Sequence, residues 1–409
     1  MTAFASVESI RAAFPALRRI VGAHPVAYFD GPGGTQVPAV VADAVTDYLL
    51  HHNANTHWAY PTSAETDAAL LDARDVFASF MGSAADEISF GNNMTTITFH
   101  VARALARDWK PGDEVIVTEI DHHGNIAPWQ AIARDHGIIL KWLPLDTATG
   151  LLRLDELPRL LGPKTRLLAI NAASNILGTI SDVASAAQQA HAAGALVFVD
   201  GVHFAPHQLP DVHRLGADFL AVSAYKFHGP HVGVLWARRD LTEQLDVPRL
   251  EPAPETSPER WETGTQNHEG IVGAAAAVRW LAGLAGPGEL RSQLAAAYAE
   301  IHRREMVLFA RLWDGLGAIP GVTRYGLPPD RDRTATVSFT LSGVPSEQVA
   351  RTLARSGCFV SHGDFYAATV ARLLGCERDG LVRIGAACYT TAGEIERVLQ
   401  GIEDVAAQR

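Results

Sequence analysis

Short apolar runs alternate with amphipathic segments along residues 85–240. The runs have the length and apolar character typical of strands; they span residues 87–90, 114–120, 139–145, 166–174, 195–200, 218–224 and 233–238. Between them lie amphipathic segments such as residues 95–108 and 182–194, and the second stops at Gly194 as a helix commonly does. Several runs are apolar on both faces, which suits a sheet covered by helices on both sides. The pattern predicts an α/β fold with a largely parallel sheet.

The pattern changes after this alternating region. Residues 246–268 are rich in proline and charge and indicate a long surface loop. A helical stretch over 270–315 follows. The remaining predicted elements are strands at 334–341, 358–361 and 381–386 and helices at 346–356 and 391–406. We therefore expect a large domain over residues 26–284 and a smaller α+β domain formed by residues 1–25 and 285–409.

Composition and charge narrow the class of protein. The 409 residues are 47% hydrophobic and 19% charged, as in a soluble globular protein. The net charge of −11 does not favour nucleic acid or an anionic membrane as a partner. No signal peptide is evident, and the Ala-rich stretch 271–286 contains Arg279 and is too short to span a bilayer. Three cysteines suit a reducing compartment, so we expect a cytoplasmic protein.

Polar residues follow the predicted strands at the positions where open α/β sheets bind ligands. Met94 and Thr95 open a helix after the first strand, where free backbone N–H groups and hydroxyls suit a phosphate. The sequence DHHGN (121–125) follows the second strand, and Asn175 follows the run 166–174. Asp200 and Lys226 end two further strands, 26 residues apart, which allows neighbouring strand ends to present both to one ligand.

A phosphate cradle, an aromatic ring, an amide, a carboxylate and a lysine together match the needs of pyridoxal 5′-phosphate. Its aldehyde requires an amine, and its ring nitrogen stays protonated beside a buried carboxylate. Taken singly, these residues have simpler interpretations: Lys226 as a solvated side chain, Asp200 and Thr95 as helix caps, and His122 as a loop histidine. The combination favours the cofactor site.

The motifs DHHGNIAPW, ASNILGTI, VDGVHFAPH and SAYKFHGP resemble the class V aminotransferase family of fold-type I pyridoxal-phosphate enzymes, in its cysteine desulfurase-like branch. The resemblance runs from AYFDGPGG (27–34) to VRIGAACY (382–389). It implies a fold-type I transferase fold and a Schiff base between Lys226 and the cofactor. Asp200 would partner the pyridine nitrogen, and His122 would stack on the ring.

The resemblance implies roles for further residues as well. Asn175 would bond the 3-oxygen of the cofactor ring, and Arg383 would bind the substrate carboxylate bidentately. Thr265 would reach the phosphate bound by the other subunit, so a homodimer is expected. The remaining residues of the expected cofactor site are Thr95, Ser223 and Tyr225 at the phosphate, together with Met94 and His203.

The chain departs from cysteine desulfurases on the substrate side. Their nucleophilic cysteine corresponds to Tyr366, which cannot carry a persulfide. Ser361 stands where they hold a second arginine, and His203 where they hold a glutamine. We therefore expect a lyase that breaks a Cβ–heteroatom bond of the C–S type in an amino acid, with an aminotransferase or an epimerase as the alternative.

Particular residues are expected to carry this chemistry. Lys226, once released from the cofactor, would be the base at Cα, with His203 or Tyr366 as a second acid or base. Asp364 and His362 would contact the substrate side chain.

Other functional classes remain open at this stage. Histidines His203, His207, His228 and His231, with Asp200, could line the metal site of a hydrolase, but this leaves Lys226 and Asn175 unexplained, and we expect no metal. The sequence GPGGTQ (31–36) lacks the last glycine of a dinucleotide-binding loop. A non-catalytic binding protein on the same fold is a third possibility, which the intact pair of Asp200 and Lys226 does not favour.

Overall fold

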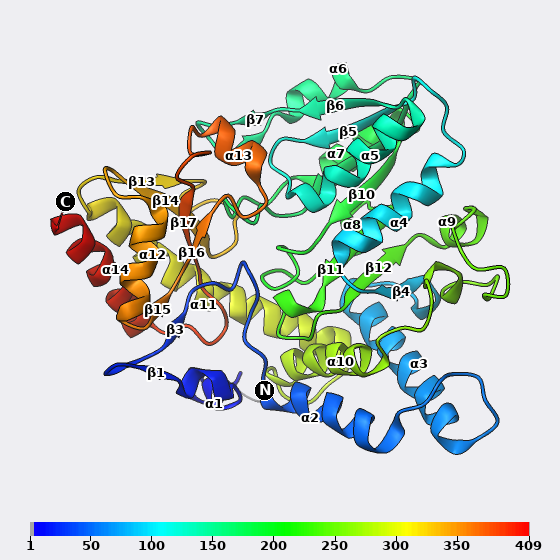
Figure 1. The fold of residues 1–409 in the computed structure, drawn as a ribbon, viewed down its shortest axis with the longest axis horizontal. Coiled ribbons are helices and arrows are strands. Elements are labelled where there is room, and N and C mark those ends of the chain that lie inside the picture. Colours follow the sequence, from blue (N-terminus) through cyan, green and yellow to red (C-terminus); the bar gives the residue numbers. More distant parts are fainter. Residues whose placement is uncertain (1–3, 409) are drawn as a thin grey trace.

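The computed structural model describes residues 4–408 and has two lobes of unequal size (Figure 1). The larger lobe contains a seven-stranded sheet in the order β4-β12-β11-β10-β9-β5-β6. These strands are β4 (Ile88–Gly91), β5 (Glu114–Thr118), β6 (Ile139–Leu143), β9 (Thr165–Asn171), β10 (Leu196–Asp200), β11 (Phe219–Ser223) and β12 (Gly233–Ala237). Only β12 runs antiparallel to its neighbours among them. The predicted α/β fold with a mostly parallel sheet is confirmed.

Helices cover both faces of this sheet, because successive strand residues point to opposite sides. On β10, Val197 and Val199 belong to a core cluster under the helices α7 and α10, whereas Phe198 packs into a second cluster under α4 and α5. The helices of this lobe are α2 (Ala39–Asp47), α3 (Pro61–Met81), α4 (Met94–Ala106), α5 (Ala127–His136), α6 (Leu157–Leu160), α7 (Val183–Ala192), α8 (Val212–Leu215), α9 (Arg239–Gln244) and α10 (His268–Gly283). The apolar runs of the sequence thus form the central strands, which are buried on both faces.

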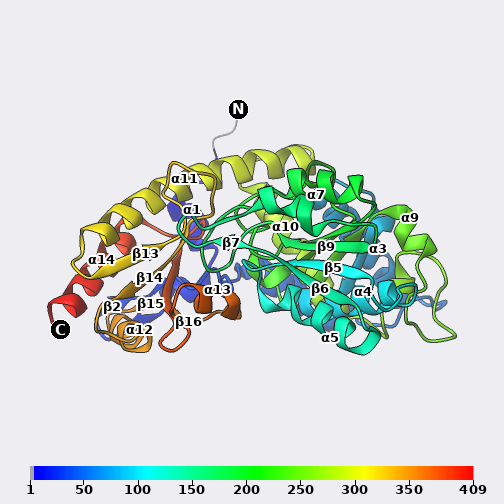
Figure 2. The same ribbon diagram turned by 90° about the horizontal axis from the view of Figure 1, so that it is seen from above.

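The smaller lobe is built on an antiparallel sheet in the order β13-β14-β17-β16. Its strands are β13 (Val322–Tyr325), β14 (Thr336–Leu341), β16 (Ser361–Gly363) and β17 (Leu381–Gly385), and its helices are α12 (Ser346–Arg355), α13 (Ala368–Leu373) and α14 (Ala392–Ala407). Helix α11 (Leu290–Ala318) runs along both lobes (Figure 2). Its Tyr298 packs into the core of the large lobe and its Phe309 into that of the small lobe, so one helix joins the two cores.

The N-terminal segment contacts both lobes. Helix α1 (Val7–Ala12) and the following turn place Ile10 and Phe14 in the core of the large lobe. Strand β3 (Ala27–Tyr28) pairs in parallel with β15 (Cys358–Phe359), beside the small sheet. The expected domain boundaries at residues 25/26 and 284/285 stay a prediction, and residues 1–3 of the expected small domain lie outside the described part of the chain.

Two expectations need correction in detail. The proline-rich segment 246–268 is largely irregular, but it is not only a surface loop, because Val247 and Trp261 are buried in the core beside α4. Glu262 of the same segment forms a buried bidentate ion pair with Arg74. The helical stretch expected over 270–315 is two helices, α10 and α11, interrupted around Pro287. Among residues 4–408, no helix is long and apolar enough to cross a membrane.

Candidate functional site

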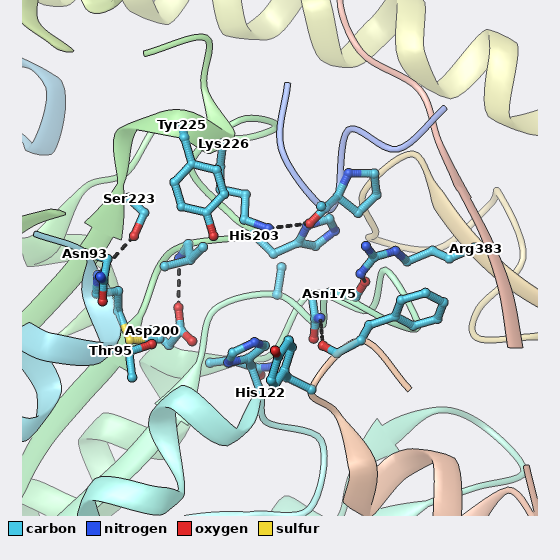
Figure 3. Close-up of a pocket in the computed structure, with 18 of the residues that line it drawn as sticks. Asn93, Thr95, His122, Asn175, Asp200, His203, Ser223, Tyr225, Lys226 and Arg383 are labelled. Atoms are coloured by element: carbon cyan, nitrogen blue, oxygen red, sulfur yellow. Dashed lines mark hydrogen bonds between the residues drawn. The ribbon is translucent and has the colours of Figure 1, made fainter. Parts of the chain in front are cut away.

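A cavity of about 990 Å³ opens between the two lobes, at the ends of the central strands (Figure 3). The strand register explains why residues from distant positions meet here: Asp200 at the end of β10 pairs with Ala221 on β11 and with Asn171 on β9. Parallel neighbouring strands deliver their carboxyl ends to one edge of the sheet. The predicted site residues that line the cavity are Met94, Thr95, His122, Asn175, Asp200, His203, Ser223, Tyr225, Lys226, His362, Asp364, Tyr366 and Arg383.

Lys226 ends a short 3-10 turn, Ala224–Lys226, directly after β11, and its side chain is buried. Its ammonium group donates a hydrogen bond to the carbonyl of Pro32 and lies 5.0 Å from the centre of the Tyr225 ring. Burial, followed by the positive charge of Arg383, lowers the pKa of Lys226 to about 7. A lysine in this position can therefore be a neutral, nucleophilic amine near neutral pH.

Asp200 is fully enclosed at the end of β10, and its Oδ1 accepts a hydrogen bond of 2.9 Å from the backbone N–H of Val202. Burial raises the pKa of Asp200 to about 7, although that hydrogen bond and the nearby Lys226 oppose the shift. A buried carboxyl with one satisfied oxygen is suited to partner a cationic or proton-bearing ligand atom.

The N-terminus of α4 forms one end of the cavity. Asn93 caps the helix by accepting a hydrogen bond from the Thr96 N–H at 2.9 Å, and the Met94 N–H donates to the Ser223 hydroxyl at 3.0 Å. The Ser223 hydroxyl keeps its own proton for a further acceptor. Thr95 lies beside Gly124, where a Cβ atom would meet the Thr95 hydroxyl at 2.8 Å. The helix start and these hydroxyls form a cradle that suits an anion.

His122 follows β5 and faces the cavity from the loop before α5. Its Nδ1 accepts a hydrogen bond of 2.8 Å from the Gly124 N–H, so the ring nitrogen nearer the backbone carries no proton. Burial, reinforced by Lys226, lowers the pKa of His122 to about 4. The ring is thus neutral and offers an apolar face, and its centre lies 5.6 Å from that of Tyr366.

Arg383, on β17 of the small sheet, is buried and lacks a carboxylate partner within ion-pair distance among the described residues. Its Nη1 donates to the backbone carbonyl of Asn175 at 2.9 Å, and its Nε has no hydrogen-bond partner. Burial lowers the pKa of Arg383 to about 9, with partial compensation from Asp30. A buried guanidinium without a counter-ion is a binding site for an anionic group.

The loop that carries Tyr366 reaches the cavity from the small lobe. Tyr366 is 73% exposed, and its carbonyl accepts a hydrogen bond of 2.7 Å from the His123 N–H. The Asn175 side chain donates to the Phe365 carbonyl at 2.9 Å, while the Asn175 Oδ1 is buried without a partner. His362 and Asp364 are exposed at the cavity mouth.

The histidines considered as metal ligands make separate contacts. His203 Nε2 lies 3.1 Å from the Thr334 hydroxyl, and burial lowers the pKa of His203 far below its ordinary value. His207 pairs with Glu305, and His228 contacts the carbonyl of Gln36. Within residues 4–408, no three His, Cys, Asp or Glu side chains are grouped as a metal site.

Thr265 lies outside the cavity of Lys226. It is exposed in the segment 246–268 and lines a separate cavity of about 600 Å³, together with the exposed apolar residues Trp58, Leu71 and Leu250. In a single chain, therefore, the expected phosphate contact of Thr265 is not made.

Two residues near the cavity, Asp30 and Phe365, were not among the expected site residues, and His231 was considered only as a metal ligand. Phe365 lies over Arg383, with 4.0 Å between the guanidinium carbon and the ring centre. His231 stacks on Tyr225 at 4.9 Å, and Asp30 is largely buried, with one oxygen unpartnered and a raised pKa caused by burial. The position of Asp30 after an apolar run was the available signal for that residue. No local pattern distinguishes Phe365.

Comparison with known proteins identifies the family of this chain. The family model of class V aminotransferases matches residues 27–398. A cysteine desulfurase of Pectobacterium atrosepticum is 33% identical over 416 residues, and an aminotransferase-like protein of Gibberella zeae is 34% identical over 413 residues; each match covers 98% of this chain and 98% of the relative. The apo structure of a cysteine desulfurase from Thermococcus onnurineus has a TM-score of 0.90 at 27% identity, over the full length of both chains. The chain belongs to the class V aminotransferase family, in its cysteine desulfurase-like branch, and is a pyridoxal-phosphate-dependent enzyme.

Proposed function

We propose that this enzyme is a lyase that cleaves a Cβ–heteroatom bond, of the C–S type, in an amino-acid substrate without storing sulfur on a cysteine. One observation carries the proposal: Lys226 and the unpaired Arg383 share a cavity whose described wall contains no cysteine. Cys358 and Cys376 are buried elsewhere, and burial raises the pKa of Cys388 well above its ordinary value. A desulfurase needs a reactive thiolate beside its substrate, and buried thiols of this kind are inert.

The residues of the cavity fit pyridoxal phosphate. The cradle formed by the α4 N-terminus, Thr95 and Ser223 suits its phosphate, and the enclosed carboxyl of Asp200 suits its ring nitrogen. The unpartnered Oδ1 of Asn175 and the amine of Lys226 would complete the set. When bound, the cofactor supplies an electron sink that makes the Cα–H of an amino acid acidic.

The remaining steps belong to the side chains of this chain. Arg383 would bind the substrate carboxylate and orient Cα. Because its pKa is about 7, the amine of Lys226 can take the Cα proton near neutral pH. The Tyr366 hydroxyl would then donate a proton to the departing heteroatom, whereas His203, whose lowered pKa keeps its ring neutral, would act as a base. Asp364 and His362, at the cavity mouth, would contact the substrate side chain.

A homodimer is part of the proposal. Family members are generally dimers that act on small amino-acid substrates. Large apolar side chains lie exposed around the cavity of Thr265: Trp58 is 62%, Leu71 62% and Leu250 61% exposed. Exposed apolar residues gathered around one hollow are typical of an interface. We propose that a second copy covers this face and that Thr265 completes the phosphate site of the other subunit.

A panel of amino acids tests the reaction type. Purified holoenzyme is mixed with each amino acid while the visible spectrum is recorded and ammonia, oxo acids and sulfide are assayed. Ammonia with an oxo acid, and with sulfide from sulfur-containing substrates, supports the lyase. Conversion of the cofactor to its pyridoxamine form would instead establish an aminotransferase. Inversion at Cα, with neither ammonia nor the pyridoxamine form produced, would establish an epimerase.

A further inference from the structure

The aromatic ring of Phe365 covers one face of the guanidinium group of Arg383. The guanidinium carbon lies 4.0 Å from the ring centre, the distance of a close cation–π contact. Arg383 is buried, so this contact is shielded from water. Arginine stacks on aromatic faces while its edges remain available for hydrogen bonds.

The backbone that presents Phe365 has an unfavourable conformation. Phe365 and Tyr366 are consecutive and have φ angles of 55° and 57°, in the left-handed region that bulky residues rarely adopt. Such residues are strained and persist only where the surroundings impose them. Here the Asn175 side chain binds the Phe365 carbonyl at 2.9 Å, and the His123 N–H binds the Tyr366 carbonyl at 2.7 Å. Both partners belong to the large lobe, so the loop conformation is imposed across the cavity.

The contacts around Arg383 leave one edge of its guanidinium group for a ligand. Nη1 donates to the Asn175 carbonyl, whereas Nε has no partner. Residue 33 is a glycine and has no side chain to fill the space beside Nη2. A Cβ atom at this position would lie 3.4 Å from Nη2, so Gly33 leaves the space open. Nε and Nη2 form the fork that binds a carboxylate through two parallel hydrogen bonds.

We propose that Phe365 is a positioning residue that acts through Arg383 and thereby sets the discrimination for substrates with a free carboxylate. The inference rests on the proposed function of Arg383. Phe365 fixes the plane of the guanidinium group and excludes water from one face, while the Asn175 carbonyl fixes Nη1. The remaining fork is then oriented before the substrate arrives, which reduces the ordering cost of binding.

Glycine and glycinamide test this inference, because they differ only in the carboxylate. Each is titrated into holoenzyme while the visible spectrum of the cofactor reports binding. The Kd of glycinamide divided by the Kd of glycine measures carboxylate discrimination. We expect Phe365→Leu to lower this ratio about 5- to 10-fold, as expected for loss of a desolvated cation–π contact. Arg383→Lys sets the lower limit, and Phe365→Tyr, which keeps the aromatic face, should restore the wild-type ratio.

A matched control removes a similar contact elsewhere. The guanidinium carbon of Arg304 lies 4.6 Å from the ring centre of Phe4, beside a different cavity, and Phe4→Leu should leave the ratio unchanged. An unchanged ratio in Phe365→Leu, with discrimination intact in the wild type, would overturn the role of Phe365 alone. Wild-type enzyme that binds both ligands equally would overturn the carboxylate role of Arg383, and the inference with it.

Discussion

The two walls of the cavity are built differently. The sheet wall, comprising Thr95, Asp200, Ser223 and Lys226, consists of strand ends and a helix start from the large lobe, and its polar groups are mostly paired within the protein. The loop wall, residues 361–366 with Arg383, comes from the small lobe and contains exposed side chains and left-handed backbone. Arg383 Nε there has no partner.

This difference separates two tasks. The paired groups of the sheet wall are held in place by the protein before a cofactor binds, as a preorganised site requires. The unpartnered Nε of the loop wall calls for a ligand atom, because a buried polar group without a partner costs about 1–3 kcal/mol. We therefore expect substitutions in the sheet wall to abolish chemistry and substitutions in the loop wall to alter selectivity.

The largest effect is expected from Lys226→Ala in the sheet wall. Loss of the base at Cα should reduce turnover by about 10³-fold or more. The variant should also lack the visible absorption band that the wild-type holoenzyme shows and that borohydride abolishes. Turnover is measured with the best substrate of the amino-acid panel. Lys141→Ala serves as the control, because Lys141 forms an ion pair with Glu114 and does not line the cavity. Normal turnover in Lys226→Ala would remove this lysine from the mechanism.

A smaller but still large loss is expected from Asp200→Asn. The amide keeps the shape of the side chain but cannot hold a proton on the ring nitrogen of the cofactor. We expect turnover to fall about 10²-fold, equivalent to about 3 kcal/mol in the activation free energy. Glu347→Gln, on the exposed surface of α12, controls for loss of a carboxylate and should have no effect. Equal turnover of Asp200→Asn and wild type would contradict the role of Asp200.

The pH dependence of cofactor uptake tests the lowered pKa of Lys226. In the cofactor-free chain the neutral amine is the nucleophile, so the uptake rate should rise about 10-fold per pH unit below the pKa and level off above about 7. Stopped-flow absorbance measures the rate. A solution of Nα-acetyl-lysine is the reference, because its side-chain amine has a pKa of about 10.4. A protein rate that keeps rising in parallel with this reference would show that Lys226 is not perturbed.

The smallest effect is expected from Thr265→Val, outside both walls. Loss of one hydrogen bond of about 1 kcal/mol should weaken cofactor retention about 5-fold. In the proposed dimer each subunit completes the site of the other, so dilution should release cofactor and monomer together. Analytical ultracentrifugation with absorbance detection measures both. Thr263→Val, in the same exposed segment, is the control. A monomer that retains its cofactor would contradict the shared site.

The sheet wall could be predicted from the sequence, and the loop wall only in part. Strand periodicity places Asp200 and Lys226 at strand ends, and the parallel register then brings those ends together. The stacking of Phe365 on Arg383 depends on how the small lobe docks against Asn175, which no local pattern encodes. Burial of Trp261 within a proline-rich segment was missed for the same reason. Elements follow local periodicity, whereas contacts between lobes depend on tertiary packing.

Our main proposal is that the cavity holds the cofactor apparatus of a desulfurase-like enzyme without a sulfur-storing thiol. Its most direct test is intact-protein mass spectrometry of the holoenzyme after incubation with cysteine, with peptide mapping of Cys358, Cys376 and Cys388. We predict no added sulfur on any cysteine, even where sulfide is released by elimination. A stoichiometric persulfide on Cys376, or on either of the other two cysteines, would contradict the account.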